Sequence, residues 1–189
     1  NAGQMCVAPD YVLVPQSLEV VFTEHLKEVV QKFFGDNPST SYDYGKIINE
    51  KHFERLVNYL KDGEIVSGGK HDKSKLYIEP TLMRNIDNSA AVMEDEIFGP
   101  ILPIIPYKTK EEALSIMEKH KNPLAFYIFS SSKKNQQYWL NKVPSGGVCI
   151  NSAAIHLTNP SLPFGGRGNS GIGQYHGKFG FDTFTHPKA

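Results

Sequence analysis

Cys6, close to the start of the chain, is the residue best suited to covalent chemistry. It follows a Gly-Gln-Met run that predicts a backbone turn. The thiolate is the nucleophilic form of cysteine, so Cys6 reacts only where its surroundings stabilise that form, for example through backbone N–H groups at a helix start. Such N–H groups could also hold a developing oxyanion, and Gly3 lets a substrate approach the backbone closely. A single cysteine is more often a small core residue than a nucleophile, so both interpretations stay open on these grounds.

The second cysteine and the histidines give no sign of other cysteine or metal chemistry. Cys149 lies in an apolar run, which predicts a core position. The two cysteines form no CxxC pair and no disulfide framework in a chain of 189 residues, which favours a reducing compartment. The seven histidines have no partner acid or cysteine at a metal-ligand spacing, so no metal site is expected.

Two further segments contain residue types that suit nucleotide binding. Glu96 ends an acidic run and Phe98 follows it, and by default they are a surface charge and a core aromatic. A carboxylate only accepts hydrogen bonds and can take both hydroxyls of a ribose. Residues 166–171 have the spacing G-x-G-x-x-G, but no hydrophobic strand precedes them as a dinucleotide-binding turn requires. We therefore expect a tight loop there.

Three motifs, in order along the chain, resemble those of the aldehyde dehydrogenases. They are residues 1–6 (NAGQMC), 96–100 (EIFGP) and 162–166 (LPFGG), the last continuing through 168–171. The class 3 branch, which acts on medium-chain, fatty and aromatic aldehydes, is most similar at residues 6–11, 175–178 and 184–186. The resemblance covers essentially the whole chain. Met5 departs from the family pattern, which often has Thr at this position, and it would alter the pocket beside the sulfur without removing the nucleophile.

The resemblance implies chemical roles for several residues. Cys6 attacks the aldehyde to give a thiohemiacetal, hydride passes to NAD or NADP, and water hydrolyses the resulting thioester. Glu96 holds the hydroxyls of the nicotinamide ribose, and Phe98 packs beside the nicotinamide ring. The aldehyde pocket is lined by a loop that follows an apolar strand and by one residue of the third motif: Asn151, Ile155, His156 and Phe164. His156 fits a surface histidine equally well.

The resemblance also implies that residues 1–189 are the cysteine-bearing catalytic domain of a longer enzyme. The chain begins at Asn1, just before the predicted nucleophile. In the family, the NAD(P)-binding domain, the general-base glutamate and the oxyanion-hole asparagine precede this motif, and they are absent from this sequence. We therefore expect little or no turnover from residues 1–189 alone. The expected partners are an N-terminal dinucleotide-binding domain of the same enzyme and further copies of it, in a homo-oligomer such as a dimer.

Strands alternate with helices along the chain, which predicts an α/β fold with a mostly parallel twisted sheet flanked by helices. Helices are expected at about residues 17–34, 49–61, 109–119 and after Ser132. Strands are expected at 11–14, 65–67, 76–78, 101–107, 124–129 and 147–150. The prolines of 101–107 require non-pairing or edge positions. The segment between 67 and 76 is expected to be a solvated loop, and residues 80–93 a mixture of apolar pieces and turns.

The composition excludes some classes of partner. Lys plus Arg and Asp plus Glu both number 20, so the formal net charge is zero and neither nucleic acid nor an anionic membrane is expected as a partner. No apolar run reaches the roughly 20 residues of a membrane span, so no membrane segment is expected. The expected location is the cytoplasm, and the ligand that the family resemblance implies is an aldehyde substrate. Two alternatives stay open. One is a CoA-acylating aldehyde dehydrogenase, which the class 3-like ending disfavours, and the other is a binding or structural domain that retains the fold without turnover.

Overall fold

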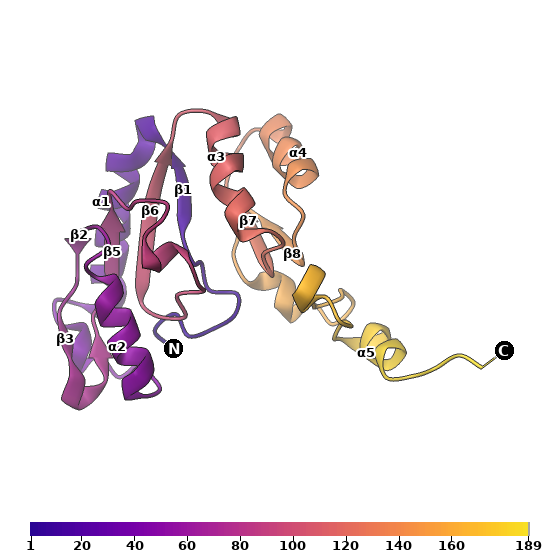
Figure 1. The fold of residues 1–189 in the computed structure, drawn as a ribbon, viewed down its shortest axis with the longest axis horizontal. Helices are drawn as coiled ribbons and strands as arrows, with labels where there is room; N and C mark the ends of the chain where they lie inside the picture. Colours follow the sequence, from indigo (N-terminus) through magenta and orange to yellow (C-terminus); the bar gives the residue numbers. More distant parts are fainter. Residues whose placement is uncertain (189) are drawn as a thin grey trace. The chain divides into compact units, whose positions relative to one another are not determined.

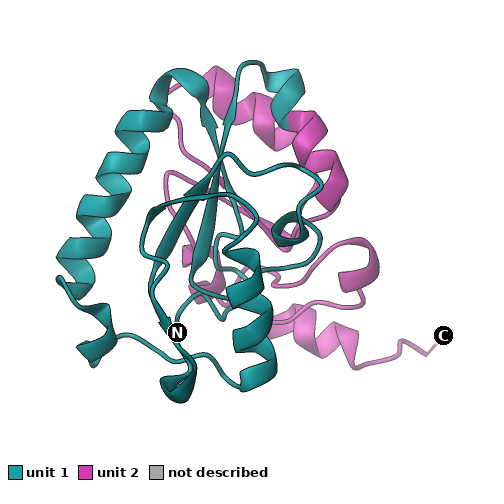
Figure 2. Ribbon diagram, turned by 60° about the vertical axis from the view of Figure 1, so that its left-hand side comes forward, with its two compact units in different colours: residues 1–113 teal, residues 114–189 magenta. Residues whose placement is uncertain are grey.

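The computed structural model describes residues 1–188 and divides the chain into two compact units. The first unit is Asn1–Ala113 and the second is Leu114–Ala189 (Figure 2). Each unit has its own parallel strand pairing, so each can be followed separately along the chain in Figure 1. The expectation that residues 1–189 act as one catalytic domain stays a prediction.

A four-stranded sheet forms the centre of the first unit (Figure 1). Its strand order is β1-β6-β5-β2, with β1 at Val12–Pro15, β6 at Ile101–Tyr107, β5 at Thr81–Arg84 and β2 at Glu64–Ser67. Strands β1 and β5 run parallel to β6, whereas β2 is antiparallel to β5 and has an irregular register between Ile65 and Ser67.

The prolines of β6 lie in a strand that has a neighbour on both sides, so of the two positions expected for them, non-pairing or edge, the edge does not apply. The register explains how the strand tolerates them. Residues 101–103 pair with β5, and residues 104–107 pair with β1. Pro103 and Pro106 therefore each lie in a half of the strand that is paired on one side only. Because proline lacks a backbone N–H, it can be accommodated where the strand has no second neighbour to bond.

Two amphipathic helices cover the first unit. Helix α1, Glu19–Phe34, follows a 3-10 turn at Gln16–Leu18 and packs Phe22 and Leu26 against a core formed by Val14, Leu82 and Ile104. Helix α2, Glu50–Tyr59, is capped by Asn49, whose side chain accepts a hydrogen bond from the His52 amide at 2.9 Å. Both predicted helices are confirmed to within about two residues at each end.

The first unit also contains elements that the sequence pattern did not predict. Strand β3, His71–Asp72, lies in the segment expected to be a solvated loop and pairs antiparallel with β4, Tyr77–Ile78, which confirms the strand expected at 76–78. Strand β5 lies in the stretch expected to contain only apolar pieces and turns. Further 3-10 turns are at Pro38–Thr40, Lys73–Lys75 and Ala91–Met93. Each unpredicted strand has at most four residues, too few to show an alternating pattern.

The second unit is built on two parallel strands, β7 at Ala125–Ile128 and β8 at Gly147–Ile150. Helix α4, Lys133–Lys142, connects them, and the predicted cap is confirmed because the Ser132 hydroxyl accepts a hydrogen bond from the Asn135 amide at 3.3 Å. Helix α5 is Gly177–Thr183. Short 3-10 turns lie at Glu118–His120, Ile155–Thr158 and Gly168–Ser170.

Helix α3, Lys110–Met117, crosses the boundary between the units and begins with the predicted capping pair. Thr109 accepts a hydrogen bond from the Glu112 amide at 3.2 Å, and the Glu112 carboxylate reaches back to the Lys108 amide. Among residues 1–188, three of the pairings between named strands are parallel and two are antiparallel. The predicted α/β class with mostly parallel pairing is confirmed. Within residues 1–188, the helices are too short or too polar to cross a membrane.

Candidate active site

Cys6 lies in a series of tight turns at the start of the first unit. The Met5 amide donates to the Gly3 carbonyl at 2.9 Å, and the Ala8 amide donates to the Met5 carbonyl at 2.8 Å. The predicted turn is confirmed, but no helix begins at this cysteine. The thiol is exposed, whereas Ala2 and Val7 on either side of it are buried. The buried neighbours anchor the segment and leave the sulfur accessible.

The side chain of Gln4 attaches this turn to a distant part of the same unit. Its amide nitrogen donates to the carbonyl of Lys46 at 2.8 Å, and its carbonyl oxygen accepts from the Ile48 amide at 3.0 Å. The same nitrogen donates to the Asn1 carbonyl. Gln4 therefore joins the turn before Cys6 to the backbone of residues 46–48 by hydrogen bonds.

A close backbone contact joins the first motif to the second. Gly3 has a φ of +72°, and a Cβ added there would lie 2.2 Å from the carbonyl oxygen of Gly99. Only glycine fits this position, because any side chain would be strained by the backbone angle and would also overlap the neighbouring chain. The close approach that the sequence predicts for a substrate at Gly3 is made in the structure by the backbone of the second motif.

The second motif presents two exposed side chains, Glu96 and Phe98, on either side of the buried Ile97. The Ile97 amide donates to the Asp10 carboxylate at 2.8 Å. The Arg55 guanidinium donates to the Ile97 carbonyl at 2.6 Å and to the Glu96 carbonyl at 3.1 Å. Phe98 has a φ of +50°, a strained angle for a residue with a side chain. The contacts around Ile97 hold the backbone that carries this strain.

The electrostatics of Glu96 depend on the same neighbours. Partial burial raises the pKa of its carboxyl, the negative charge of Asp10 raises it further, and the positive charge of Arg55 acts in the opposite direction. Arg55 is itself held on α2, where it donates to the Tyr59 hydroxyl at 3.0 Å and lies over the Tyr59 ring. The carboxyl group is therefore placed between one anion and one cation of the same unit.

The four residues predicted to line the aldehyde pocket all lie in the second unit. Asn151, directly after β8, has its side chain bonded to the backbone of Ser130 through both its oxygen and its nitrogen. Ile155 is 60% exposed. His156 is half-buried, and its Nδ1 lies 3.2 Å from the sulfur of Cys149. The predicted core position of Cys149 is confirmed, since this residue is 6% exposed.

Phe164, the fourth of these residues, is half-buried and forms a two-residue antiparallel bridge with Tyr175. Its ring centroid lies 6.4 Å from that of His156 and 6.0 Å from that of His176. The glycine-rich run that follows contains the 3-10 turn Gly168–Ser170, and no α-helix opens there. The predicted tight loop is confirmed.

Sequence reasoning missed the residues that hold the site in the first unit, namely Asp10, Arg55 and the contacting Gly99. Asp10 lies in residues 6–11, which carry only the resemblance to the class 3 branch, and Arg55 lies on an amphipathic helix where a charged residue is ordinary. Both act on backbone groups that are 87 and 42 residues away along the chain. Spacing alone contains no signal for contacts of this kind.

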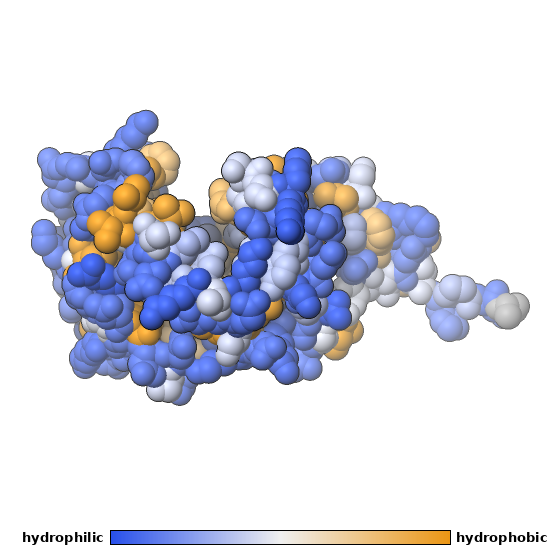
Figure 3. Space-filling view, turned by 90° about the horizontal axis from the view of Figure 1, so that it is seen from above, coloured by the Kyte–Doolittle hydropathy of each residue, from blue (hydrophilic) through white to orange (hydrophobic). Residues whose placement is uncertain are grey.

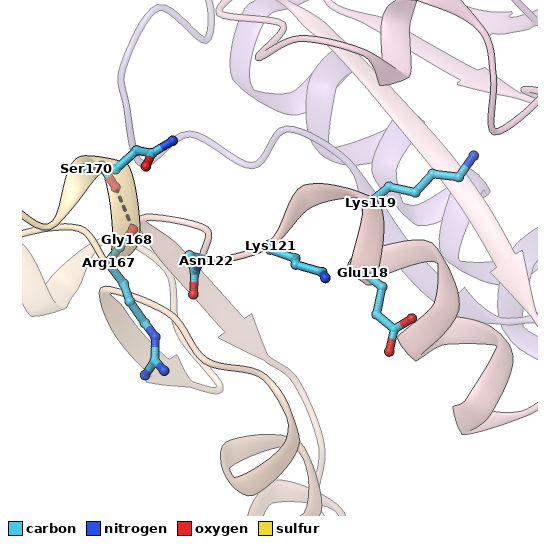
Figure 4. Close-up of a pocket in the computed structure, with 8 residues that line it drawn as sticks. Glu118, Lys119, Lys121, Asn122, Arg167, Gly168 and Ser170 are labelled. Carbon is cyan, nitrogen blue, oxygen red and sulfur yellow. Dashed lines mark hydrogen bonds between the residues drawn. The ribbon is translucent and has the colours of Figure 1, made fainter.

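Two other features of residues 1–188 bear on the chemistry. These residues contain no cluster of three or more metal-ligating side chains. A surface cavity of about 520 Å³ in the second unit is lined partly by Glu118, Lys121 and Arg167, but these side chains point in different directions (Figure 4). The cavity therefore shows no convergent set of groups for binding an anion.

In the first unit, the first two motifs are in contact with each other through Gly3 and Gly99. The third motif forms a loop in the second unit. The model of the aldehyde dehydrogenase family matches residues 1–189, and the chain belongs to this family. The resemblance expected from the three motifs is confirmed, including its class 3 character, because the relatives include mouse aldehyde dehydrogenase family 3 member B1 at 45% identity over the whole chain.

Two other relatives and one solved structure are similar over nearly the whole chain. The 4,4'-diaponeurosporen-aldehyde dehydrogenase of Staphylococcus aureus is 46% identical, with all of this chain matched to 42% of that protein. The mouse dimeric NADP-preferring aldehyde dehydrogenase is 42% identical with the same coverage. A substrate-bound structure of Staphylococcus aureus AldH superposes with a TM-score of 0.93 at 45% identity, covering 98% of this chain and 41% of that one. The chain thus spans less than half of these relatives' lengths.

Proposed function

We propose that this chain supplies the nucleophile and part of the cofactor site of an NAD(P)-dependent enzyme that oxidises aldehydes to carboxylic acids. The observation that carries the proposal is the backbone contact between Gly3 and Gly99. This contact fixes the segment of Cys6 against the segment of Glu96 and Phe98, and all three of these side chains are exposed. A nucleophile and two cofactor-binding groups are therefore presented by one rigid junction.

Cys6 begins the proposed reaction. Its thiolate attacks the aldehyde carbon, a C–S bond forms, and the carbonyl oxygen becomes the oxyanion of a thiohemiacetal. Backbone N–H groups of the exposed turn around Cys6 are the proposed donors to that oxyanion. Loss of hydride from the same carbon leaves a thioester on Cys6. Water then breaks the C–S bond, which releases the acid and restores the thiol.

The residues of the second motif fit a nicotinamide cofactor. The exposed Glu96 carboxylate can accept both hydroxyls of a ribose, and the exposed Phe98 ring offers a flat apolar face beside the nicotinamide. The bound cofactor supplies the hydride acceptor. The printed names of relatives support either form, since one is NADP-preferring and an aldehyde dehydrogenase of Mycobacterium tuberculosis was solved with NAD+. NAD or NADP is the proposed cofactor.

The proposed substrates are fatty or aromatic aldehydes. The similar enzymes include one named for 4,4'-diaponeurosporen-aldehyde, and the class 3 resemblance points to the same chemical class. Asn151, Ile155, His156 and Phe164 are the proposed lining of the aldehyde pocket. Three of these side chains are apolar or aromatic, which suits an alkyl or aryl chain.

The proposed assembly is a homo-oligomer such as a dimer, located in the cytoplasm, in which an N-terminal dinucleotide-binding domain completes the enzyme. Apolar patches on the surface support further protein contacts (Figure 3). Helix α1 alone exposes Val20, Val21, Val29 and Phe33. One relative is named as dimeric. We expect residues 1–189 by themselves to show little or no turnover.

Trapping of the thioester tests the proposal. The full-length enzyme is mixed with NAD or NADP and a fatty aldehyde, quenched in acid and digested for mass spectrometry. We expect an acyl mass on the peptide with Cys6, and loss of both the adduct and turnover by at least about a thousandfold in Cys6→Ala. Cys149→Ser serves as the matched cysteine control and should keep the adduct. An acyl group on Cys149, or full turnover by the Cys6→Ala variant, would contradict the proposal.

A further inference from the structure

The loop that follows β8 turns back onto the strand that it leaves. Asn151 has a φ of +53° and Ala154 a φ of +62°, and these two left-handed residues reverse the chain before the 3-10 turn Ile155–Thr158. As a result, His156 lies over β8, seven residues after Cys149, with its Nδ1 3.2 Å from the Cys149 sulfur. The first half of the loop is attached to Ser130 through Asn151, and the second half is attached to β8 through this one hydrogen bond.

The surroundings of His156 define its protonation state. Burial lowers the pKa of the imidazole, which favours the neutral ring. A neutral ring can accept the thiol proton at Nδ1, which leaves its own proton on Nε2. Within residues 1–188, Nε2 is buried and has no hydrogen-bond partner. The Nε2 proton of this tautomer has no acceptor, so among residues 1–188 the Cys149 thiol at Nδ1 is the group that holds the ring by a hydrogen bond.

Packing holds the ring in the same place. A Cβ at Gly147 would lie 2.6 Å from Cδ2 of His156, so the ring rests directly on the glycine backbone of β8. The ring also makes an edge contact with Tyr127, with centroids 6.1 Å apart, and a tilted contact with Phe164. Its neighbour in the turn, Ile155, is 60% exposed. One residue of the turn is thus anchored while the adjacent apolar residue is presented outward.

We propose that the Cys149–His156 hydrogen bond positions the loop of residues 151–158 and thereby sets how the enzyme discriminates among aldehydes of different chain length. The inference rests on the proposed function of this loop as part of the aldehyde pocket. Cys149 and His156 are positioning residues, and Ile155 is the side chain whose placement they control. Loosening the bond lets Ile155 take several positions, which weakens the contact with a long alkyl chain most.

The first arm of the test measures the loop itself and needs no activity. Hydrogen exchange of the amides of Ile155 and Leu157, which donate to carbonyls within the loop, is followed by mass spectrometry in the full-length enzyme. Cys149→Val removes the donor, and His156→Phe removes the acceptor but keeps an aromatic ring. We expect exchange to become about three- to tenfold faster in both variants, and no faster in the double variant. Cys149→Ser keeps a donor and should stay within about twofold of wild type.

The second arm measures discrimination. The ratio of kcat/KM for a long-chain aldehyde to that for a short-chain aldehyde should fall about three- to tenfold in Cys149→Val, mainly through KM for the long substrate, with kcat within about twofold. Cys149→Ser, which keeps a hydrogen-bond donor, should keep the wild-type ratio of kcat/KM values. Unchanged exchange in both single variants would overturn the positioning role, and faster exchange with an unchanged ratio would overturn the role in discrimination. Failure of the proposed function appears differently, as absence of aldehyde oxidation by the wild-type enzyme.

Discussion

The two units hold their candidate functional residues by different means. In the first unit, the segments of Cys6 and Glu96 meet through glycine backbones, and charged side chains hold the buried Ile97 between the exposed groups. In the second unit, a loop is held by an amide side chain, one thiol-to-imidazole hydrogen bond and aromatic contacts. The first arrangement tolerates almost no movement of the backbone, whereas the second can shift by a side-chain rotation. Bond-forming chemistry and recognition of variable chains place these different demands on a protein.

The largest effect is expected at the backbone contact of the first unit. Gly3→Ala places a Cβ against the Gly99 carbonyl at a backbone angle that alanine avoids. We expect a loss of stability of more than about 2 kcal/mol and a loss of most activity, because strain and overlap add at one position. Chemical denaturation and steady-state kinetics measure the two effects. Gly35→Ala is the control, since its backbone angle is also left-handed but a Cβ there meets no other atom. Equal losses of stability and activity in Gly3→Ala and Gly35→Ala would show that the contact between Gly3 and Gly99 has no special role.

A second change removes the charged group that holds the second motif. Arg55→Met leaves the carbonyls of Glu96 and Ile97 without their donor. Hydrogen bonds from charged groups contribute about 1.5–3 kcal/mol, so we expect KM for the cofactor to rise by roughly tenfold or more. The matched control is Arg84→Met, which breaks an exposed ion pair with Glu64 in the same unit and should change little. A cofactor KM within twofold of wild type in Arg55→Met would argue against this role.

A smaller effect in the second unit would sharpen the contrast between the units. Asn151→Ala removes two hydrogen bonds to Ser130 and puts alanine at a left-handed angle that asparagine tolerates better. We expect a loss of about 1–2 kcal/mol in stability and a severalfold rise in KM for the aldehyde, with KM for the cofactor unchanged. Steady-state kinetics with each substrate varied in turn separates the two constants. A change in KM for the cofactor instead would contradict the assignment of aldehyde binding to the second unit and cofactor binding to the first.

The smallest expected effect is a shift along the pH axis. Asp10 raises the pKa of Glu96, and the cofactor contact requires the ionised carboxylate, so KM for the cofactor should rise as the pH falls through that pKa. Asp10→Asn removes the negative charge but keeps an oxygen to accept from the Ile97 amide. The rise in KM should therefore move to lower pH in this variant. A shift to higher pH, or none, would contradict the electrostatic coupling.

The same raised pKa determines the sign of the effect on stability. Folding favours the protonated form of Glu96, so its contribution to stability is present at low pH and is lost as the pH rises through the pKa of the folded state. Asp10→Asn lowers the pKa of Glu96 toward its ordinary value, so stability should fall less as the pH rises. Urea denaturation across the acidic range measures the difference between the variant and wild type.

Local patterns in the sequence predicted most of the regular structure. Helices α1 and α2 have apolar residues at helical spacing, and the caps at Asn49, Thr109 and Ser132 lie where a short polar side chain precedes such a pattern. The short strands β3 and β5 were missed, because two to four residues contain too little periodicity. The position of β6 between two neighbours was also not predicted, since its prolines allowed either non-pairing positions or an edge, and only the split register decides between them.

By itself, the sequence determined the family, the identity of the candidate nucleophile and helices α1 to α4 but not α5, because each depends on residue types at fixed short spacings. Only the tertiary structure decided what surrounds these residues. The contact of Gly3 with Gly99, the hold of Asp10 and Arg55 on Ile97, and the bond between Cys149 and His156 each depend on how the chain returns to itself. Geometry of this kind arises from the packing of whole elements, and neighbouring residues along the chain do not encode it.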